Sequence, residues 1–152
     1  MAHFSAKQLK NFMQFWPPLL GAGIKVKEFT DDGTRVVVTH KPNMLTKNAM
    51  GVAFGGTMSA MTDPFFMLAS MHRLGKEYKI WDTAGEIQFL KPGRGTLTAD
   101  MRIPDETYEL IKEKTAGGEK YLHWFEVDIV DEEGDTVAHV RRQVYYRLIQ
   151  KK

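Results

Sequence analysis

The spacing of apolar residues changes several times along the chain, and each change predicts a different kind of element. From Phe4 to Phe15 the apolar residues recur at the spacing of a helix. Ser5 can cap this helix, and the Pro17-Pro18 pair is expected to end it. We predict a short amphipathic helix that lies across the body of the domain.

The next apolar segments have the composition of strands. Residues 23–29 and 34–40 alternate or cluster β-branched residues around an Asp-Asp-Gly turn, which predicts a hairpin. Residues 41–54 then contain proline, asparagine and glycine without a clear period, so a long loop is expected to lead to a Gly-Gly pair. Loops of this length often carry function.

Residues 57–74 form the most apolar stretch of the chain. Methionine, phenylalanine, leucine and alanine occupy nearly every side of a helix drawn through this stretch, and charges are few. A helix that is apolar almost all round has to be buried, so we place it at the centre of the fold.

The rest of the chain is mostly strand-like. It contains four segments rich in strand-forming residues. A polar stretch over residues 105–118, helical at 108–114, separates the second segment from the third. The four segments are residues 78–90, 96–103, 120–131 and 135–149. Two strands, one buried helix and four further strands predict an α+β fold, in which a curled antiparallel sheet wraps around one long central helix.

Composition sets the scale of the fold and of its partners. The 152 residues, 43% of them hydrophobic, suit one domain over residues 1–152. Long strands such as the last one, over 135–149, could pair edge to edge with a second copy, so a homodimer is expected.

Composition also excludes several kinds of chemistry. The chain has no cysteine, which removes disulfides, thiol nucleophiles and cysteine-ligated metals, and its five histidines lack metal-ligand spacing. The net charge of +2, spread along the chain, argues against a nucleic-acid partner. Because residues 1–21 hold no long apolar run, we expect a cytoplasmic protein with no membrane partner. The histidine spacing predicts that no metal is bound.

The segment from Asn48 to Asp63 carries a motif. It reads Asn-Ala-Met-Gly-Val-Ala-Phe-Gly-Gly, followed by an aspartate seven residues after the second glycine. This resembles the hotdog-fold thioesterases of the phenylacetyl-CoA (PaaI-like) type, whose pattern is Asn-x-x-Gly-x-x-His-Gly-Gly with an aspartate at the same distance. The likeness extends from roughly Gly23 to the end of the chain. Phe54 stands where many of these enzymes have histidine, so the chain looks closer to a DUF4442-like branch of the superfamily.

The resemblance implies hydrolysis of an acyl-CoA or acyl-carrier thioester, with coenzyme A only as part of the substrate and no separate cofactor. Backbone N–H groups at Gly55, Gly56 and Thr57 would stabilise the oxyanion at the start of the helix. Asp63 would act as general base or attack the thioester directly, while Asn48 would position water or substrate. Without chemistry, the glycines would make a tight helix entry, and Asp63 would mark a kink before proline.

Further residues are candidates for substrate binding. Thr83 matches a polar position near the nucleophile in similar enzymes, although it also suits an ordinary strand. Phe54 could line an acyl tunnel, and Lys91 and Arg94, with the Arg141-Arg142 pair, could meet coenzyme A phosphates. In such dimers the opposite subunit completes the pocket, and a dimer of dimers is also open.

Three other functions fit the sequence. A non-catalytic acyl-thioester or lipid-binding hotdog protein is favoured by Phe54 in place of histidine. A hydratase or dehydratase is disfavoured, because residues 41–71 contain no histidine. A subunit that uses the fold only for dimerisation would lack a pocket beside Asp63.

Overall fold

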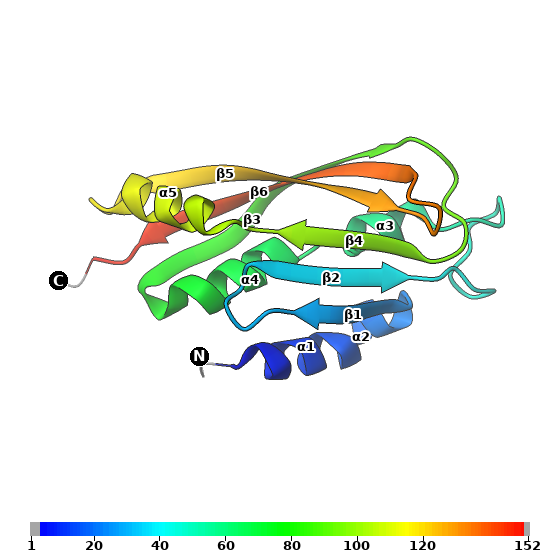
Figure 1. Cartoon of the computed structure of the whole chain (residues 1–152), viewed down its shortest axis with the longest axis horizontal. Coiled ribbons are helices and arrows are strands. Elements are labelled where there is room, and N and C mark those ends of the chain that lie inside the picture. Colours follow the sequence, from blue (N-terminus) through cyan, green and yellow to red (C-terminus); the bar gives the residue numbers. More distant parts are fainter. Residues whose placement is uncertain (1–3, 151–152) are drawn as a thin grey trace.

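The computed structural model describes residues 4–150 as one six-stranded sheet with helices on its concave side and along its edges (Figure 1). The strands are β1 (Ile24–Phe29), β2 (Arg35–His40), β3 (Tyr78–Phe89), β4 (Leu97–Arg102), β5 (Lys120–Val130) and β6 (Thr136–Leu148). The helices are α1 (Ala6–Phe15), α2 (Pro17–Gly21), α3 (Gly55–Ala60), α4 (Phe65–Leu74), the 3₁₀ turn η1 (Gly75–Glu77) and α5 (Asp105–Thr115). Each predicted strand is present, and the predicted α+β architecture is confirmed.

The sheet is antiparallel throughout, in the order β1-β2-β4-β5-β6-β3. It curls around the central helices, because α4 packs against β2, near one edge, and also against β6 and β3 at the other. Phe65 and Phe66 of α4 are fully buried there, among inward-facing residues such as Val38 and Tyr146. Burial of these aromatic and aliphatic side chains holds the sheet on the helix.

The buried central helix is present in two pieces rather than one. α3 ends at Ala60 and α4 begins at Phe65, with a turn and a cis Asp63-Pro64 bond between them. Pro64 takes the N-cap position of α4, which suits a residue without a backbone N–H. The kink considered for Asp63-Pro64 is therefore a complete break, and Asp63 stands in a turn rather than inside a helix.

Helix α1 covers the outer edge of β1. Ser5 caps it in a capping box with Gln8, as its sequence predicts. The Lys10 ammonium donates to the Lys27 carbonyl oxygen at 2.6 Å, and the Gln14 side-chain oxygen accepts from the β1 backbone at 3.0 Å. These bonds satisfy backbone groups that an uncovered edge strand would expose. The Pro17-Pro18 pair ends α1 as expected but also opens the short helix α2.

Strand β3 is the other edge of the sheet. It pairs with β6 on one side only, and over its 12 residues its second side meets no other strand in the described chain. The expectation that the last strand would supply the pairing edge is wrong, because β6 lies between β5 and β3.

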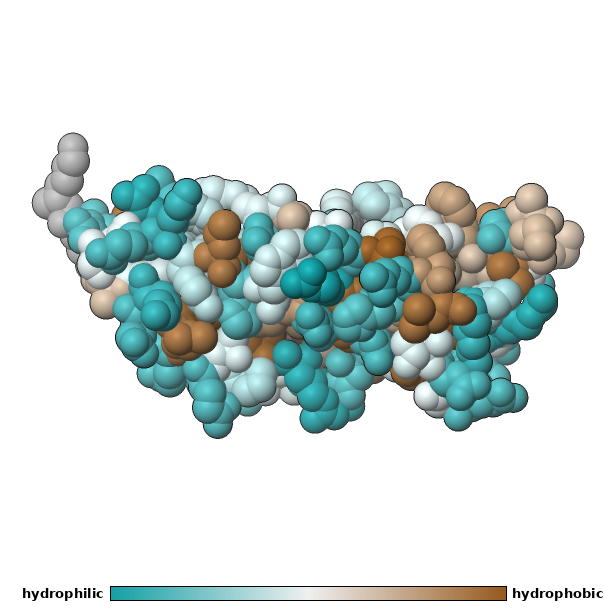
Figure 2. Space-filling view, turned by 90° about the horizontal axis from the view of Figure 1, so that it is seen from above, coloured by the Kyte–Doolittle hydropathy of each residue, from teal (hydrophilic) through white to brown (hydrophobic). Residues whose placement is uncertain are grey.

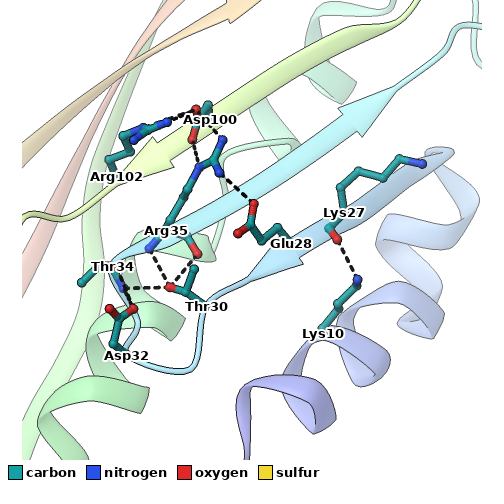
Figure 3. A network of polar contacts seen from close by, with 9 residues as sticks. All are labelled: Lys10, Lys27, Glu28, Thr30, Asp32, Thr34, Arg35, Asp100 and Arg102. Atoms are coloured by element: carbon teal, nitrogen blue, oxygen red, sulfur yellow. Dashed lines mark hydrogen bonds and ion pairs between the residues drawn. The ribbon is translucent and has the colours of Figure 1, made fainter.

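The outer face of the sheet is polar and tied together by ion pairs. Arg35 bridges Glu28 at 2.9 Å and Asp100 at 2.8 Å, and Asp100 also meets Arg102 (Figure 3). Such a face is solvated, so the functional surface has to be sought on the concave side or at the rims of the sheet.

Candidate functional site

The start of α3 presents backbone donors. The first helical bonds run from the Thr57 and Met58 N–H groups to the Phe54 carbonyl oxygen, at 3.0 and 3.2 Å. Within residues 4–150, the N–H groups of Gly55 and Gly56 have no hydrogen-bond acceptor. Two neighbouring unpaired N–H groups at a helix start can bind an anionic or strongly polarised oxygen.

Both glycines are also required by packing. A β-carbon on Gly55 would lie 2.8 Å from the Phe89 ring, and one on Gly56 would overlap the Phe54 ring. Neither glycine has a positive φ, so glycine is favoured here by the close approach of the two rings and not by backbone conformation. The rings therefore flank the same N–H groups that are free to bind a ligand.

Two hollows meet at this helix start. The larger, of about 530 Å³, is lined by Asn48, Met50, Val52, Gly55, Met58, Phe89, Leu90, Lys91 and Arg94. The smaller, of about 440 Å³, is lined by Ala22, Leu45, Asn48, Phe54, Gly56 and Thr57 among others. Figure 2 shows apolar side chains gathered towards the right end of the molecule, where Figure 1 places the loop before α3 and the β3–β4 connection.

Asn48 lies between the two hollows and organises the loop that forms them. Its side-chain oxygen accepts from the Met50 and Val52 N–H groups at 2.9 and 3.3 Å, and its amide donates to the Ala53 carbonyl oxygen at 3.4 Å. The predicted Asn48 is thus at the site, but most of its bonding capacity shapes the loop.

Asp63 is held by a buried arginine. Arg142 on β6 donates to the Asp63 carboxylate at 3.2 Å, and the two side chains are 9% and 50% exposed. The same guanidinium donates to the Thr62 hydroxyl at 3.1 Å and the Ser59 carbonyl oxygen at 2.6 Å. Asp63 keeps an exposed side towards solvent, and it lines neither hollow.

Strand β3 brings a second carboxylate to this arginine. Burial raises the pKa of the Asp82 carboxyl to about 6, and the negative charge of Asp63 adds to the rise, while Arg142 opposes it. A β-carbon on Gly85 would lie 2.6 Å from the Arg142 guanidinium, so this glycine makes room for it. Asp63, Asp82 and Arg142 therefore form one electrostatic group beside the open edge.

The remaining predicted residues have other partners. Thr83 stands in a bulge of β3 and donates to the Gln143 side chain at 2.9 Å. The Lys91 ammonium sits between Asp131 and Asp135, at 2.7 Å from each, so two carboxylates already neutralise it. Arg94 is exposed, lines the larger hollow and, in the described chain, forms no ion pair.

The expectation that Arg141 and Arg142 contact coenzyme A phosphates needs correction. Arg142 pairs with Asp63, and Arg141 pairs with Glu86 at 2.9 Å and Glu126 at 3.2 Å, so neither is free for a coenzyme A phosphate. Within residues 4–150, one group of carboxylates has the spacing of metal ligands: Asp131, Glu133 and Asp135. Two of them, Asp131 and Asp135, form ion pairs with Lys91.

Sequence reasoning missed the roles of Arg142 and Asp82. The signal was strand alternation: Arg142 falls on the inward face of β6 with Val140 and Val144, and Asp82 follows inward-facing Ile80 on β3. A charge on a buried face needs a partner.

An antiparallel sheet curled around a buried central helix is the arrangement of the hotdog class of proteins. Within this class the chain belongs to the family described as "Domain of unknown function (DUF4442)", whose model matches residues 5–146. No curated protein matches the chain.

Solved structures share this fold at low sequence identity. A protein from Pseudomonas aeruginosa, described as of unknown function and a probable thioesterase, has a TM-score of 0.82 at 14% identity, over 97% of this chain and 99% of its own. A thioesterase from Haemophilus influenzae has a TM-score of 0.71 at 16% identity, over 99% and 95%. The PaaI protein of the Escherichia coli phenylacetic acid degradation operon has a TM-score of 0.66 at 21% identity, over 95% of each chain.

None of the helices within residues 4–150 is long and apolar enough to cross a membrane.

Proposed function

We propose that this protein hydrolyses acyl thioesters at a site shared by two copies of the chain. The observation that carries the proposal is the pair of unpaired N–H groups on Gly55 and Gly56 at the mouth of an apolar hollow. An acyl chain fits the hollow, and the thioester carbonyl oxygen fits the N–H pair. The distant structural likeness to thioesterases is in keeping with this chemistry.

In the proposed reaction, Asp63 takes a proton from water as the water oxygen attacks the carbonyl carbon. The negative charge that develops on the carbonyl oxygen is stabilised by the Gly55 and Gly56 N–H groups. The carbon–sulfur bond then breaks, and the leaving thiolate takes up the proton that Asp63 removed from water, which restores the Asp63 carboxylate. Direct attack by the Asp63 carboxylate would instead form a mixed anhydride that water hydrolyses.

Within one protomer Gly55 and Asp63 are too far apart to serve one carbonyl. Gly55 begins α3 and Asp63 lies in the turn beyond its last residue, Ala60, so the length of α3, about 8 Å, already separates them. Gly55 lies against Phe89 of β3. Asp63 is bound by Arg142, whose guanidinium lies against Gly85, four residues or about 13 Å from Phe89 on the same strand.

Pairing of β3 with β3 of a second copy resolves this separation. If the two strands run antiparallel about a two-fold axis at Ile87, Gly85 of one copy lies opposite Phe89 of the other. Asp63 of the partner subunit then approaches Gly55 across the interface. Because α1 covers the β1 edge, β3 is the edge that can pair in this way.

The substrate would be an acyl-CoA or an acyl-carrier thioester. Arg94 lines the larger hollow and, among residues 4–150, pairs with no carboxylate, so it is the cation best placed for a phosphate of either carrier. Lys91 is less suitable, because a phosphate would have to compete with Asp131 and Asp135.

The test is release of free thiol from short, medium, long and aryl acyl-CoA esters by wild type and by Asp63→Asn. We expect the variant to lose about 10²- to 10⁴-fold in kcat, because it loses the base or nucleophile. Asp31→Asn, a change in the exposed β1–β2 turn, is the matched control and should keep full activity. Equal turnover in Asp63→Asn would contradict the assigned role.

A non-catalytic acyl-binding protein is the second candidate. Phe54 replaces the histidine of the related motif, and Asp63 lines neither hollow of the single protomer. Saturable binding of acyl-CoA to wild type, without hydrolysis of any ester, would favour this alternative.

A further inference from the structure

Helix α1 has an aromatic surface on the side away from the core. Ala6 and Met13 are buried against the sheet, whereas Phe12 and Phe15 are 63% and 71% exposed. A surface helix normally turns polar residues outward, so two outward phenylalanines need an explanation.

The apolar surface continues beyond α1. Trp16 is the N-cap of α2, and Leu20 lies on that helix. Gly21, the last residue of α2, and its C-cap Ala22 line the smaller hollow together with Leu45. Met44 and Leu45 project from the loop before α3, and both are 95% exposed. Phe12, Phe15, Trp16, Leu20, Met44 and Leu45 are called here the aromatic rim.

The charge around the aromatic rim is of one sign. Residues 1–27 contain four lysines and residues 41–62 contain two, and neither segment contains an aspartate or glutamate. Lys41 and Lys47 flank the Met44-Leu45 pair, while the others lie on α1 and β1. In the described chain none of the six forms an ion pair. The acidic residues beside these lysines are Glu28, which follows Lys27 and pairs with Arg35, and Glu132, whose pKa Lys41 helps to lower.

From these observations we infer that the aromatic rim binds the surface of an anionic membrane. Phenylalanine, tryptophan and leucine insert at the boundary between headgroups and acyl chains, and flanking lysines contact acidic headgroups. A second copy fits this surface less well, because a two-fold contact would bring six lysines against six lysines without a carboxylate between them. The inference replaces the expectation of no membrane partner with peripheral binding, and it is independent of thioester hydrolysis.

The experiment is co-sedimentation of the full chain with vesicles of phosphatidylcholine alone and of equal parts phosphatidylcholine and phosphatidylglycerol. We expect binding to the mixed vesicles, weak binding to phosphatidylcholine alone, and loss of binding at high salt, because the lysines are screened. The double variant Phe12→Ser/Phe15→Ser should bind the mixed vesicles roughly tenfold or more weakly. Both side chains are exposed, so its melting temperature should stay close to that of wild type.

The control is Leu122→Ser/Ile149→Ser, which removes two exposed apolar side chains from β5 and the segment after β6. It should bind like wild type. Absence of binding to the mixed vesicles, or equal binding by Phe12→Ser/Phe15→Ser, would overturn the inference. A smaller oligomer for that variant than for wild type on size-exclusion chromatography would also overturn it, because a second copy would then cover the rim.

Discussion

At the scale of single residues, the buried guanidinium of Arg142 is the contact that organises the candidate site. It joins β6 to the turn between α3 and α4 through Ser59, Thr62 and Asp63. Asp63 is half exposed, so its ion pair alone contributes modestly to the stability of the fold. The Ser59 and Thr62 oxygens are shielded from water, so losing the Arg142 donor would leave them without a hydrogen bond.

The first residue-scale prediction concerns Arg142. Arg142→Gln should lower the free energy of unfolding by about 1–3 kcal/mol, because buried acceptors lose their donor. Arg141→Gln, which alters an outward-facing neighbour, should cost less than about 1 kcal/mol. Urea unfolding of both variants measures the difference, and equal losses would show that Arg142 has no special role.

The second residue-scale prediction concerns pH. The Asp82 pKa is about 6 in the folded protein and ordinary in the unfolded chain. The folded state therefore holds the proton more tightly, and the stability of wild type falls as pH rises from about 4 to about 6. Asp82→Asn does not titrate and should be more stable than wild type by about 1–2 kcal/mol above that range, after allowance for solvent screening. Both proteins should be equally stable below about pH 4; a stability difference that does not vary with pH would contradict the assignment.

The residues of the site could be predicted where they follow one another in sequence. Gly55, Gly56 and Asp63 stand at fixed spacing in a short segment, and the structure places the glycines at the start of α3 and Asp63 in the turn between α3 and α4. Arg142 and Asp82 escaped prediction because their meeting depends on strand pairing: Arg142 is 79 residues from Asp63. Spacing along the chain carries no information about such a contact.

At the scale of elements, the open edge of β3 determines how copies of the chain can meet. The sheet has two edges, and α1 covers the one at β1. Hydrophobic pattern does not give the order of the strands, so it cannot show that β6 is an inner strand of the sheet. The hydrophobic pattern of a long segment predicts that it is a strand, but it does not predict which strands lie beside it in the sheet.

Cysteine cross-linking tests the β3 pairing directly, because the natural chain has no cysteine. A single cysteine placed in turn at Glu86, Ile87 or Gln88 should form a disulfide between copies under mild oxidation, fastest at Ile87, where the proposed two-fold axis lies. A cysteine at Ile149 is the control and should cross-link slowly. No preference for the β3 positions on a non-reducing gel would rule out this register.

The central helix shows what pattern can and cannot reveal about an element. Its burial followed from the apolar residues over 57–74. The break between Ala60 and Phe65 did not, because the apolar pattern continues through it. Pro64 was the local signal, and the turn it helps to form lets Asp63 reach Arg142.

At the scale of the whole molecule, the order of elements was enough to predict a sheet curled around a helix. The aromatic rim and the open β3 edge were not predicted, because each depends on which apolar residues remain uncovered after folding. Two faces are thus left for partners: β3 for a second copy and the rim for a membrane. The α1 and α2 part of the rim lies at the β1 edge of the sheet, opposite the β3 edge.

Each proposed site takes Gly55 from one copy and Asp63 from the other. Co-expression of Asp63→Asn with Gly55→Ala tests this sharing, because each variant alone lacks one half of every site. A β-carbon at Gly55 meets the Phe89 ring and disturbs the N–H pair. In mixed dimers one of the two sites is then fully natural, so thiol release should return to about a quarter of the wild-type rate with random pairing. No recovery, from variants that both form dimers and are inactive alone, would contradict the shared site.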